Sequence, residues 1–462
     1  MNITNIALSG LNASRVALDV TAQNVANVNT PGYSRQQALM ASVAGSAHDK
    51  LDAGMGVEVT SIRRVTDDFL VKQTWSTGSA LAHAENYSSN FEQLENTLGA
   101  DGFSISAGLD SLFAALHDAT VKPESLPLRQ QIINESEALA RRFNMLSETL
   151  YNQHRDLSEQ RTSEISHANS LLVNIADVNK RIVEMQGAGG NPAQLMDTRD
   201  LLLTQLSQEV EIRTTTQSNG GIQVSLVTGQ PLVIGGDYGQ LQAVPHDDDA
   251  YMADLKVEFG KQSFAVKGSV GGKIGAINDF QQNVLKSNQI SLDDMAASLA
   301  NKFNEVLEGG ADLNNEDGVP LFKFDPEHPA SSIDLDENIT PEKLALAAGG
   351  SDENLPGNSD TLAELIKVSN EPFEISGLGQ VSLNDAFTSM LGGTAIKARQ
   401  ASSDYSAQDA MNKQAVAARD NVSAVNSDEE AANLMTFANA HNANMKVIST
   451  ANQLFDSVLQ LF

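Results

Sequence analysis

The residue types that most often carry chemistry are present in this sequence, but their spacing does not match a catalytic or metal-binding motif. The eight histidines are scattered, and none belongs to a His-Glu-x-x-His arrangement or to another close set of metal ligands. We interpret His441, which lies in an apolar row, as a packing or hydrogen-bonding residue. The chain contains no cysteine, which excludes disulfides, thiolate nucleophiles and cysteine metal sites. Carboxylates are abundant, but no pair can be assigned as acid and base until a fold brings two of them together.

Two short stretches approach the pattern of a ligand-binding loop and then depart from it. Residues 312–318, DLNNEDG, are similar to a calcium loop, but the glycine is one place late and Lys323 stands where the bidentate acid should be. Residues 268–274, GSVGGKI, are similar to a phosphate loop, but the glycine spacing is one short and Ile274 replaces the magnesium-binding hydroxyl. We predict a solvated turn for the first and a strand-to-helix turn for the second. We therefore expect no catalytic residues, no metal site and no cofactor.

The composition is that of a folded, acidic protein. The 462 residues are 41% hydrophobic, contain a single tryptophan and carry a formal net charge of -29. This length allows two to four domains. The negative charge argues against binding to nucleic acid and against docking on an anionic membrane. The sequence has no run of 18 apolar residues, and its N-terminus has neither the basic start nor the apolar core of a Sec signal peptide.

The two ends of the chain are unusually poor in charge and resemble each other. Residues 1–34 contain only Arg15 and Asp19, and residues 431–462 contain only Lys446 and Asp456. A charged fraction of 19% predicts about six charges in each segment. Both segments are instead rich in Ala, Asn, Ser and aliphatic residues. We infer that their final environment is crowded and poor in water.

Both ends also repeat apolar residues every seven positions, as helices of a coiled-coil bundle do. The N-terminal row is Leu11, Leu18 and Val25, and the C-terminal rows contain Leu434, Ile448 and Phe455 in one and Val458 in the next. An isolated helix of this kind is marginally stable in water. We therefore expect the ends to be loosely ordered in the monomer and to order on assembly. An ordinary pair of terminal helices packed on their own domain remains the alternative.

The middle of the chain alternates between long helical and short extended patterns. Residues 127–186 predict one helix of about 90 Å, and a second helix follows to about residue 209. Residues 210–267 alternate with period two and predict a β-rich module. Helical periodicity returns at 273–308, residues 311–395 are mixed, and a last helix from about 397 leads into the C-terminal one. The fold class is therefore α+β, with long helices and β-rich insertion modules.

The N-terminal residues 7–36 resemble the signature of the flagellar rod, hook and hook-associated axial protein family. The positions that carry this resemblance are Asn27, Asn29, Thr30, Pro31, Gly32 and Tyr33. Physically they form a helix stop, because proline cannot continue a helix and the glycine allows a turn. Residues 425–462 resemble the matching C-terminus of the family, with Ser427 as the candidate helix cap and Glu430 three residues later.

Interior motifs are similar to those of the hook-associated members of this family. They are GMGVEV at 54–59, IRR at 62–64, RDLLL at 199–203, TGQPLV at 228–233 and GGKIG at 271–275. The resemblance is dense to about residue 325 and fades between about 326 and 395. The chain is short for this family, which suggests that an outer domain is reduced.

The resemblance implies a structural subunit at the junction between hook and filament. It implies export through the flagellar type III apparatus to an extracellular location, and assembly by coupled folding of the terminal helices. The implied partners are further copies of the chain in a ring of the axial tube, the hook protein, the next hook-associated protein or filament, and an export chaperone. Another axial subunit of hook, rod or filament is an alternative, as is an enzyme carried in an insertion module.

The expected domains are nested along the chain. Residues 1–40 and 425–462 form the terminal helical domain, which the resemblance places in the inner tube. Residues 41–209, 268–310 and 396–424 form a rod of long helices, residues 210–267 a β-rich outer module, and residues 311–395 a mixed insertion. The seven apolar residues named above are the expected contacts between subunits. Ile448→Asp is the corresponding test, because a buried unpaired charge should block incorporation.

Overall fold

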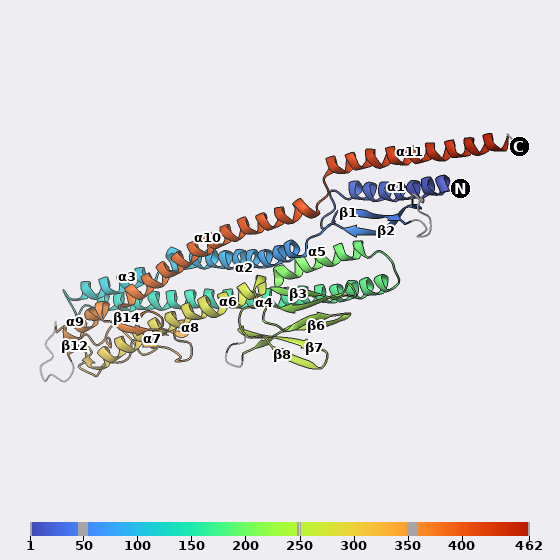
Figure 1. The fold of residues 1–462 in the computed structure, drawn as a ribbon. Helices are drawn as coiled ribbons and strands as arrows, with labels where there is room; N and C mark the ends of the chain where they lie inside the picture. Colours follow the sequence, from blue (N-terminus) through green and yellow to red (C-terminus); the bar gives the residue numbers. More distant parts are fainter. Residues whose placement is uncertain (1, 45–53, 247–248, 250, 349–357, 461–462) are drawn as a thin grey trace.

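The computed structural model describes residues 2–44, 54–246, 249, 251–348 and 358–460. The molecule is elongated, with helices running along its length and both termini at the same end (Figure 1). A β-sheet lies against one side of the long helices, and a group of short strands and helices lies at the end opposite the termini (Figure 1). The predicted α+β class is confirmed. Among the described helices, none is both long and apolar enough to cross a membrane.

The two ends of the chain form a helix pair. Helix α1 (Asn2–Ala26) and helix α11 (Ser427–Leu459) run antiparallel, side by side (Figure 1). Gly10 of α1 approaches Asn444 of α11 so closely that a Cβ on Gly10 would lie 2.8 Å from the Asn444 amide. The predicted terminal helices are therefore present, and in the single chain they pack on each other.

A β-hairpin that the sequence analysis did not predict supports α1. Strands β1 (Gln36–Val43) and β2 (Gly56–Arg64) pair antiparallel and pack against α1. The backbone N–H of Val57 donates to Ser9 Oγ of α1 over 3.1 Å. The expected domain boundary at residues 40 and 41 thus falls inside a hairpin that packs with the terminal helices.

Long helices form the rod. Its central element is α4 (Leu126–Gly187), a single helix of 62 residues that confirms the prediction for 127–186. The other helices of the rod are α2 (Asp68–Leu98), the short η1 (Asp101–Phe103), α3 (Ile105–Ala119), α5 (Ala193–Glu209), α6 (Gly272–Phe280), the π-helical η2 (Gln281–Leu285), α7 (Lys286–Glu308) and α10 (Leu383–Ser423). The segment from α6 to α7 confirms the helical pattern predicted for 273–308.

The last rod helix begins earlier than predicted, at Leu383 and not near residue 397. Ser382 caps it by accepting a hydrogen bond from the N–H of Asp385, and Phe387 and Met390 are buried. Gly392 and Gly393 lie inside this helix, although glycine costs a helix interior about 1 kcal/mol. Burial of the apolar residues on the first turns therefore outweighs the local preference that the prediction followed.

The predicted β-rich module is a six-stranded antiparallel meander. Its strands, in spatial as well as chain order, are β3 (Ile212–Thr216), β4 (Ile222–Leu226), β5 (Pro231–Ile234), β6 (Asp237–Pro245), β7 (Ala253–Phe259) and β8 (Gln262–Ala265). Its buried face shares a core with α4. Asn179 of α4 joins the two by donating to the carbonyl oxygens of Ile222 and Gly235 at 3.0 and 2.6 Å.

The segment between α7 and α10 is irregular but shares the core of the rod. It contains the strands β9 (Gly310–Ala311), β10 (Phe322–Lys323), β11 (Asp334–Leu335), β12 (Ala347–Ala348), β13 (Phe373–Ile375) and β14 (Gly379–Val381), with α8 (Pro329–Ser332), α9 (Asp360–Lys367) and η3 (Val368–Asn370). Phe322, Leu346 and Leu362 are buried in the same cluster as Phe303 of α7. The part of the expected insertion that the structure describes is thus packed on the rod.

Residues 313–317 of the turn at 312–318 are exposed, as a solvated turn requires, but Asp312 is buried. Its Oδ1 accepts hydrogen bonds from the backbone N–H groups of Asn314 and Glu316 at 2.7 and 2.8 Å. Since a buried carboxylate needs such partners, this carboxylate organises the turn from inside.

Candidate assembly interface

Helix α1 buries mainly small residues and leaves four of its large apolar residues exposed. Its buried face contains Ala7, Ala13, Ala17 and Val20, which let the hairpin and α11 approach closely. Ile3, Ile6 and Leu8 are exposed on the same helix. Because exposed large apolar residues that gather on one part of a molecule mark contact surfaces, the helix pair, with those on α1 and α11 together, presents a surface that a further chain can cover.

The structure places the seven predicted contact residues on this helix pair but divides them into two groups. Leu11, Leu18 and Ile448 are half-buried within the chain. The other four are exposed: Val25 by 43%, Leu434 by 40%, Phe455 by 65% and Val458 by 52%. The four exposed residues are available for contacts between chains. The three half-buried residues also pack within the single chain and stabilise its fold.

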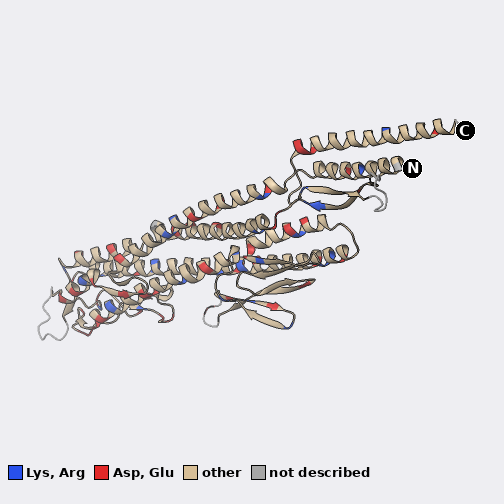
Figure 2. Ribbon diagram, viewed as in Figure 1, with Lys and Arg blue, Asp and Glu red and all other residues tan. Residues whose placement is uncertain are grey.

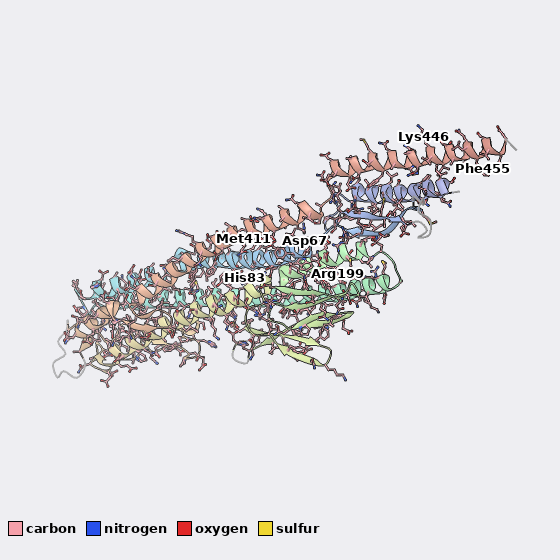
Figure 3. All side chains as sticks on the ribbon, in the orientation of Figure 1. Asp67, His83, Arg199, Met411, Lys446 and Phe455 are labelled. Atoms are coloured by element: carbon pink, nitrogen blue, oxygen red, sulfur yellow. The ribbon has the colours of Figure 1, made fainter. Side chains whose placement is uncertain are left out.

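The end of α11 extends beyond the start of α1, and we call its residues 454–459 the α11 extension. Since Asn444 lies beside Gly10 and the helices are antiparallel, α11 passes the first residue of α1 before residue 454. Figure 3 labels Phe455 on this extension. Leu454 and Leu459 are 59% and 57% exposed there. The seven-residue pattern missed both, because it does not show where the partner helix ends.

The helix pair is almost free of charge outside the first turn of α11. Figure 2 shows this contrast with the rod, where both signs of charge are scattered along the helices. The acidic first turn holds Asp428, Glu429 and Glu430, which suits the positive end of a helix dipole. The N-cap is Asn426, whose Oδ1 accepts from the N–H groups of Asp428 and Glu429. The predicted cap, Ser427, is instead the first helical residue.

The signature residues form the turn that connects α1 to the hairpin. Helix α1 ends at Ala26, and Thr30 Oγ1 donates to Asn27 Oδ1 over 3.2 Å. Gly32 adopts φ +79°, a conformation that favours glycine, and packs beside Leu201 of α5. Asn29 and Pro31 are exposed in this turn. The predicted helix stop is therefore confirmed.

Asn24 and Tyr33 fix the path of the chain out of this turn. Asn24 is buried and exchanges two hydrogen bonds of 2.9 Å with the backbone N–H and C=O of Gln36. The Tyr33 hydroxyl donates to the same Asn24 Oδ1 over 2.9 Å. Burial, with the nearby carboxylates of Asp197 and Glu430, raises the pKa of Tyr33 from 10.0 to about 12. Sequence reasoning missed Asn24, because its role depends on a strand twelve residues away.

Arg64 joins the terminal elements to the rod. Its Nε lies 2.8 Å from Asp197 Oδ1 and its Nη2 lies 2.6 Å from Asp200 Oδ2, both on α5. The same Nη2 donates to Ser34 Oγ, next to the signature turn, over 3.2 Å. Burial raises the pKa of Asp197, and the charge of Arg64 opposes this shift. Two of the similar interior motifs, at 62–64 and 199–203, are thus in direct contact.

The loop at 268–274 is a strand-to-helix turn, as predicted. Gly271 and Gly272 adopt φ +64° and +59°, and α6 begins at Gly272. A Cβ on Gly272 would lie 2.5 Å from the carbonyl of Glu209. The two glycines therefore allow the turn to pack closely against the end of α5. Lys273, the next residue, pairs with the carboxylates of Glu209 and Glu164.

Three family models match the chain. The model described as flagellar hook-associated protein FlgK helical domain matches residues 91–322. The model described as flagella basal body rod protein matches residues 5–33, and the one described as flagellar basal body rod FlgEFG protein C-terminal matches residues 419–461. The last two lie on the helix pair, and the first on the rod and the β-sheet.

Curated relatives are similar to the chain over its whole length. Flagellar hook-associated protein 1 of Bacillus subtilis (strain 168) is 27% identical over 494 residues, covering 98% of this chain and 96% of that protein. The proteins of the same name from Salmonella typhimurium and Escherichia coli (strain K12) are each 24% identical, covering 100% of both chains.

A solved structure shares the fold. The flagellar hook junction protein FlgK from Burkholderia pseudomallei matches with a TM-score of 0.67 at 14% identity, covering 76% of this chain and 99% of that one. The helical-domain model covers about half of the 462 residues. The chain belongs to the family of flagellar hook-associated proteins that this helical domain defines.

Proposed function

We propose that this chain is a structural subunit of the bacterial flagellum at the junction between hook and filament. The observation that carries the proposal is the charge-poor helix pair with its exposed apolar α11 extension, held at one end of a long rod. Curated relatives named flagellar hook-associated protein 1 support it over the full length of the chain.

In this proposal, assembly buries the exposed apolar residues of the helix pair between neighbouring copies. Full burial of a large apolar side chain is worth about 1.5–3 kcal/mol. The four on the α11 extension are 52–65% exposed, so together they would contribute roughly 3–7 kcal/mol. Association costs about 4–15 kcal/mol in lost freedom. One contact between two chains is then marginal, and a closed ring with several contacts per subunit is stable.

The seven predicted residues divide their roles within this assembly. Phe455, Val458, Val25 and Leu434 contact neighbouring chains. Leu11, Leu18 and Ile448 support the helix pair itself as well. Ile448→Asp would therefore disturb both the fold and the assembly, and Phe455→Asp is the cleaner test of the interface.

The fold supports a layout for the proposed tube. The helix pair of α1 and α11, with the hairpin of β1 and β2, would form the inner tube. The long helices surround it, and the six-stranded sheet and the segment 311–382 face outward. The partners are copies of the chain, the hook protein on one side and the next hook-associated protein or the filament on the other. An export chaperone would hold the ends during passage through the type III apparatus to the cell exterior.

Deletion of the gene, followed by electron microscopy of cells and culture medium, tests the proposal. We expect hooks without filaments, and filament protein released into the medium. Loss of the hook itself would reassign the chain to the rod or hook, and intact motile filaments would contradict a structural role at the junction.

Two alternatives make different predictions. A hook or filament subunit would polymerise without limit in purified form, whereas a junction subunit forms a short zone. An enzyme in the sheet or in the segment 311–382 would convert a substrate in the purified protein. We propose neither, because the full-length relatives are named flagellar hook-associated protein 1, and not hook protein, filament protein or an enzyme.

A further inference from the structure

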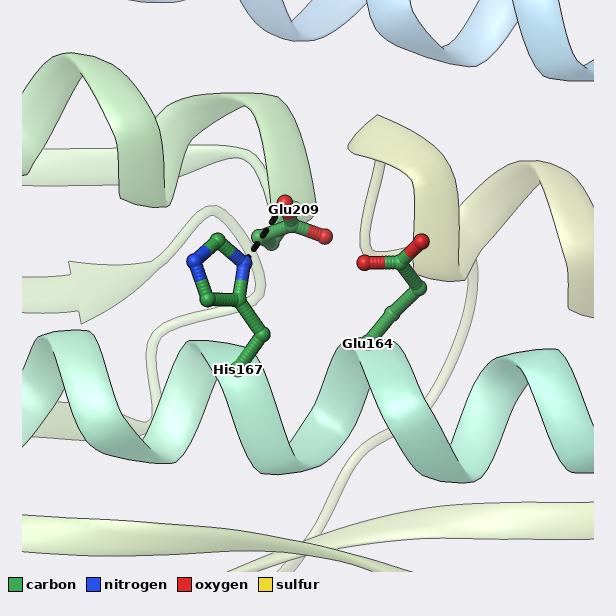
Figure 4. Close-up of side chains that lie close together, drawn as sticks. All are labelled: Glu164, His167 and Glu209. Carbon is green, nitrogen blue, oxygen red and sulfur yellow. Dashed lines mark hydrogen bonds and ion pairs between the residues drawn. The ribbon is translucent and has the colours of Figure 1, made fainter.

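A cluster of titratable side chains lies where three rod helices meet, far along the chain from the signature turn. Glu164 and His167 stand one turn apart on α4, Glu209 ends α5, and Lys273 begins α6. Figure 4 shows the two carboxylates facing each other and the imidazole beside Glu209. One ligand atom from each of Glu164, His167 and Glu209 lies within 4.8 Å of the other two.

Glu209 is the anchor of this cluster, because its side chain is only 1% exposed. Its Oε1 lies 2.9 Å from Lys273 Nζ and 3.2 Å from His167 Nδ1. Its Oε2 is buried and has no hydrogen-bond partner among the described residues. A buried carboxylate oxygen without a partner is costly, so this oxygen can gain from a further cation or donor.

The charges of the cluster do not balance. Two carboxylates face one ammonium, since Lys273 Nζ also lies 3.7 Å from Glu164 Oε2. A divalent cation would neutralise both carboxylates, whereas the ammonium neutralises one.

The geometry points to a divalent transition-metal site formed by Glu164, His167 and Glu209. Two ligands that each lie about 2.0 Å from a tetrahedral zinc ion are about 3.3 Å apart, close to the 3.2 Å between His167 Nδ1 and Glu209 Oε1. Imidazole and carboxylate ligands suit zinc and its neighbours, whereas calcium and magnesium prefer oxygen alone. Three protein ligands leave a fourth position for water.

Lys273 Nζ lies 2.9 Å from Glu209 Oε1, the oxygen beside His167, so it competes with a metal ion for the Glu209 carboxylate, whose other oxygen, Oε2, has no partner among the described residues. The Lys273 side chain is 29% exposed, so its ammonium can move into solvent when a metal ion binds. The His167 side chain is 53% exposed, so its imidazole can turn toward an incoming metal ion. In this arrangement the Lys273 ammonium pairs with the Glu209 carboxylate when no metal ion is bound. Binding of a metal ion displaces the ammonium into solvent.

A metal ion here would fasten the base of the six-stranded sheet. The sheet begins at Ile212, three residues after Glu209, and its last strand ends eight residues before Lys273. The ion would link the chain that enters the sheet to the middle of α4, against which the sheet packs. We therefore expect zinc to stabilise the sheet and the helix ends at its base.

Isothermal titration of the full, metal-free chain with zinc chloride tests the site. We expect one equivalent of zinc to bind. Loss of a residue that only supports a metal ligand weakens metal affinity by ~10–100-fold. The His167→Ala variant loses a ligand itself, so its zinc affinity should fall by more than that. Lys273→Met should strengthen binding about tenfold, because a competing positive charge is removed. The control is His117→Ala, which removes an exposed histidine on α3 and should leave binding unchanged.

Cobalt(II) supplies a second readout that does not depend on stability. A tetrahedral site should give visible d–d absorption that saturates at one equivalent and that zinc abolishes. Glu209→Gln should remove this absorption while the far-ultraviolet circular dichroism stays unchanged. The absence of one-equivalent zinc binding, or equal binding by the His167→Ala variant, would overturn the proposal and leave the cluster as an ion-pair network.

Discussion

Asn24 and Tyr33 show how single polar residues hold a domain that is otherwise almost without charge. The Asn24 amide replaces a backbone partner for Gln36 and also accepts the hydrogen bond of the Tyr33 hydroxyl. Since Asn24 is buried, each of these groups would lose its partner without access to water. The start of β1, and with it the hairpin, depends on this one side chain.

Replacement of Asn24 by alanine should therefore loosen the hairpin. We expect a loss of about 1–3 kcal/mol in local stability, the cost of leaving buried backbone groups unpaired. Hydrogen exchange of the amides in β1 and β2 measures this loss. Asn12→Ala, at an exposed position of α1, is the control and should not change their exchange. Equal exchange in both variants would show that the amide does not hold the strand.

The raised pKa of Tyr33 makes the stability of the terminal domain depend on pH in alkaline solution. Its native pKa near 12 lies above the ordinary value of 10.0, so the unfolded chain loses this proton first as the pH rises. The contribution to stability is complete below pH 10.0 and is lost between pH 10.0 and about 12. The phenolate absorbance of the native protein and of the Tyr33→Phe variant is measured against pH. The difference between the two curves, which reports Tyr33, should have its midpoint near pH 12. A midpoint near pH 10 would contradict the burial.

At the scale of elements, tight turns and one ion-pair cluster set how the helices join. The turn at Gly271 and Gly272 brings α6 against the end of α5. Arg64 brings the hairpin against the middle of α5. Helix α5 is therefore the element on which both the sheet and the terminal domain depend.

Gly272→Ala should destabilise the rod. The added Cβ would overlap the carbonyl of Glu209, and φ +59° is strained for alanine. We expect a loss of about 2–4 kcal/mol in the free energy of unfolding. Gly392→Ala is the matched control, because it lies in α10 with no heavy atom within 4 Å among the described residues. It should stabilise the protein by about 0.5–1 kcal/mol, and thermal unfolding distinguishes the two signs.

Arg64→Met should separate the terminal domain from the rod. The substitution leaves the buried Asp197 and the half-buried Asp200 without their main cation, which costs about 3 kcal/mol or more. Limited proteolysis should then cut near residue 65 much faster than in the native chain. Arg63→Met, which removes an exposed arginine, should leave the rate unchanged. Similar rates for both variants would remove Arg64 from the joint.

For the whole molecule, the distribution of apolar surface separates folding from assembly. The rod and the sheet have their own buried cores, whereas the helix pair keeps many large apolar residues exposed. Under the proposed function, neighbouring chains would cover these exposed residues.

Phe455→Asp should block incorporation into the flagellum without unfolding the chain. Phe455 is 65% exposed, so the monomer loses little, but an unpaired charge in a chain-to-chain contact is costly. We expect a folded, exported protein and hooks without filaments. Val121→Asp is the control, since Val121 is 80% exposed on the turn before α4 and should be tolerated. Normal filaments with Phe455→Asp would exclude the α11 extension from the interface.

The sequence pattern predicted correctly those helices and strands in which the spacing of apolar residues repeats many times. Helix α4 is 62 residues long and repeats its apolar residues many times, and the alternation of buried and less buried residues is clear in β4. The start of α10 was wrong because two glycines weakened a short signal that burial restores. The hairpin was missed because β1 and β2 are exposed or half-buried along both faces and have little alternation.

The sequence alone determined the charge-poor ends, the long helices, the helix stop at Pro31 and the resemblance of both termini to one family. These features depend on residue type and on spacing within one segment. The tertiary structure decided that the helix pair buries alanines and exposes Phe455, that Arg64 meets Asp197 and Asp200, and that Glu209 meets Glu164 and His167. Each of these depends on segments far apart in the chain, because the distances between them are set only when the helices pack.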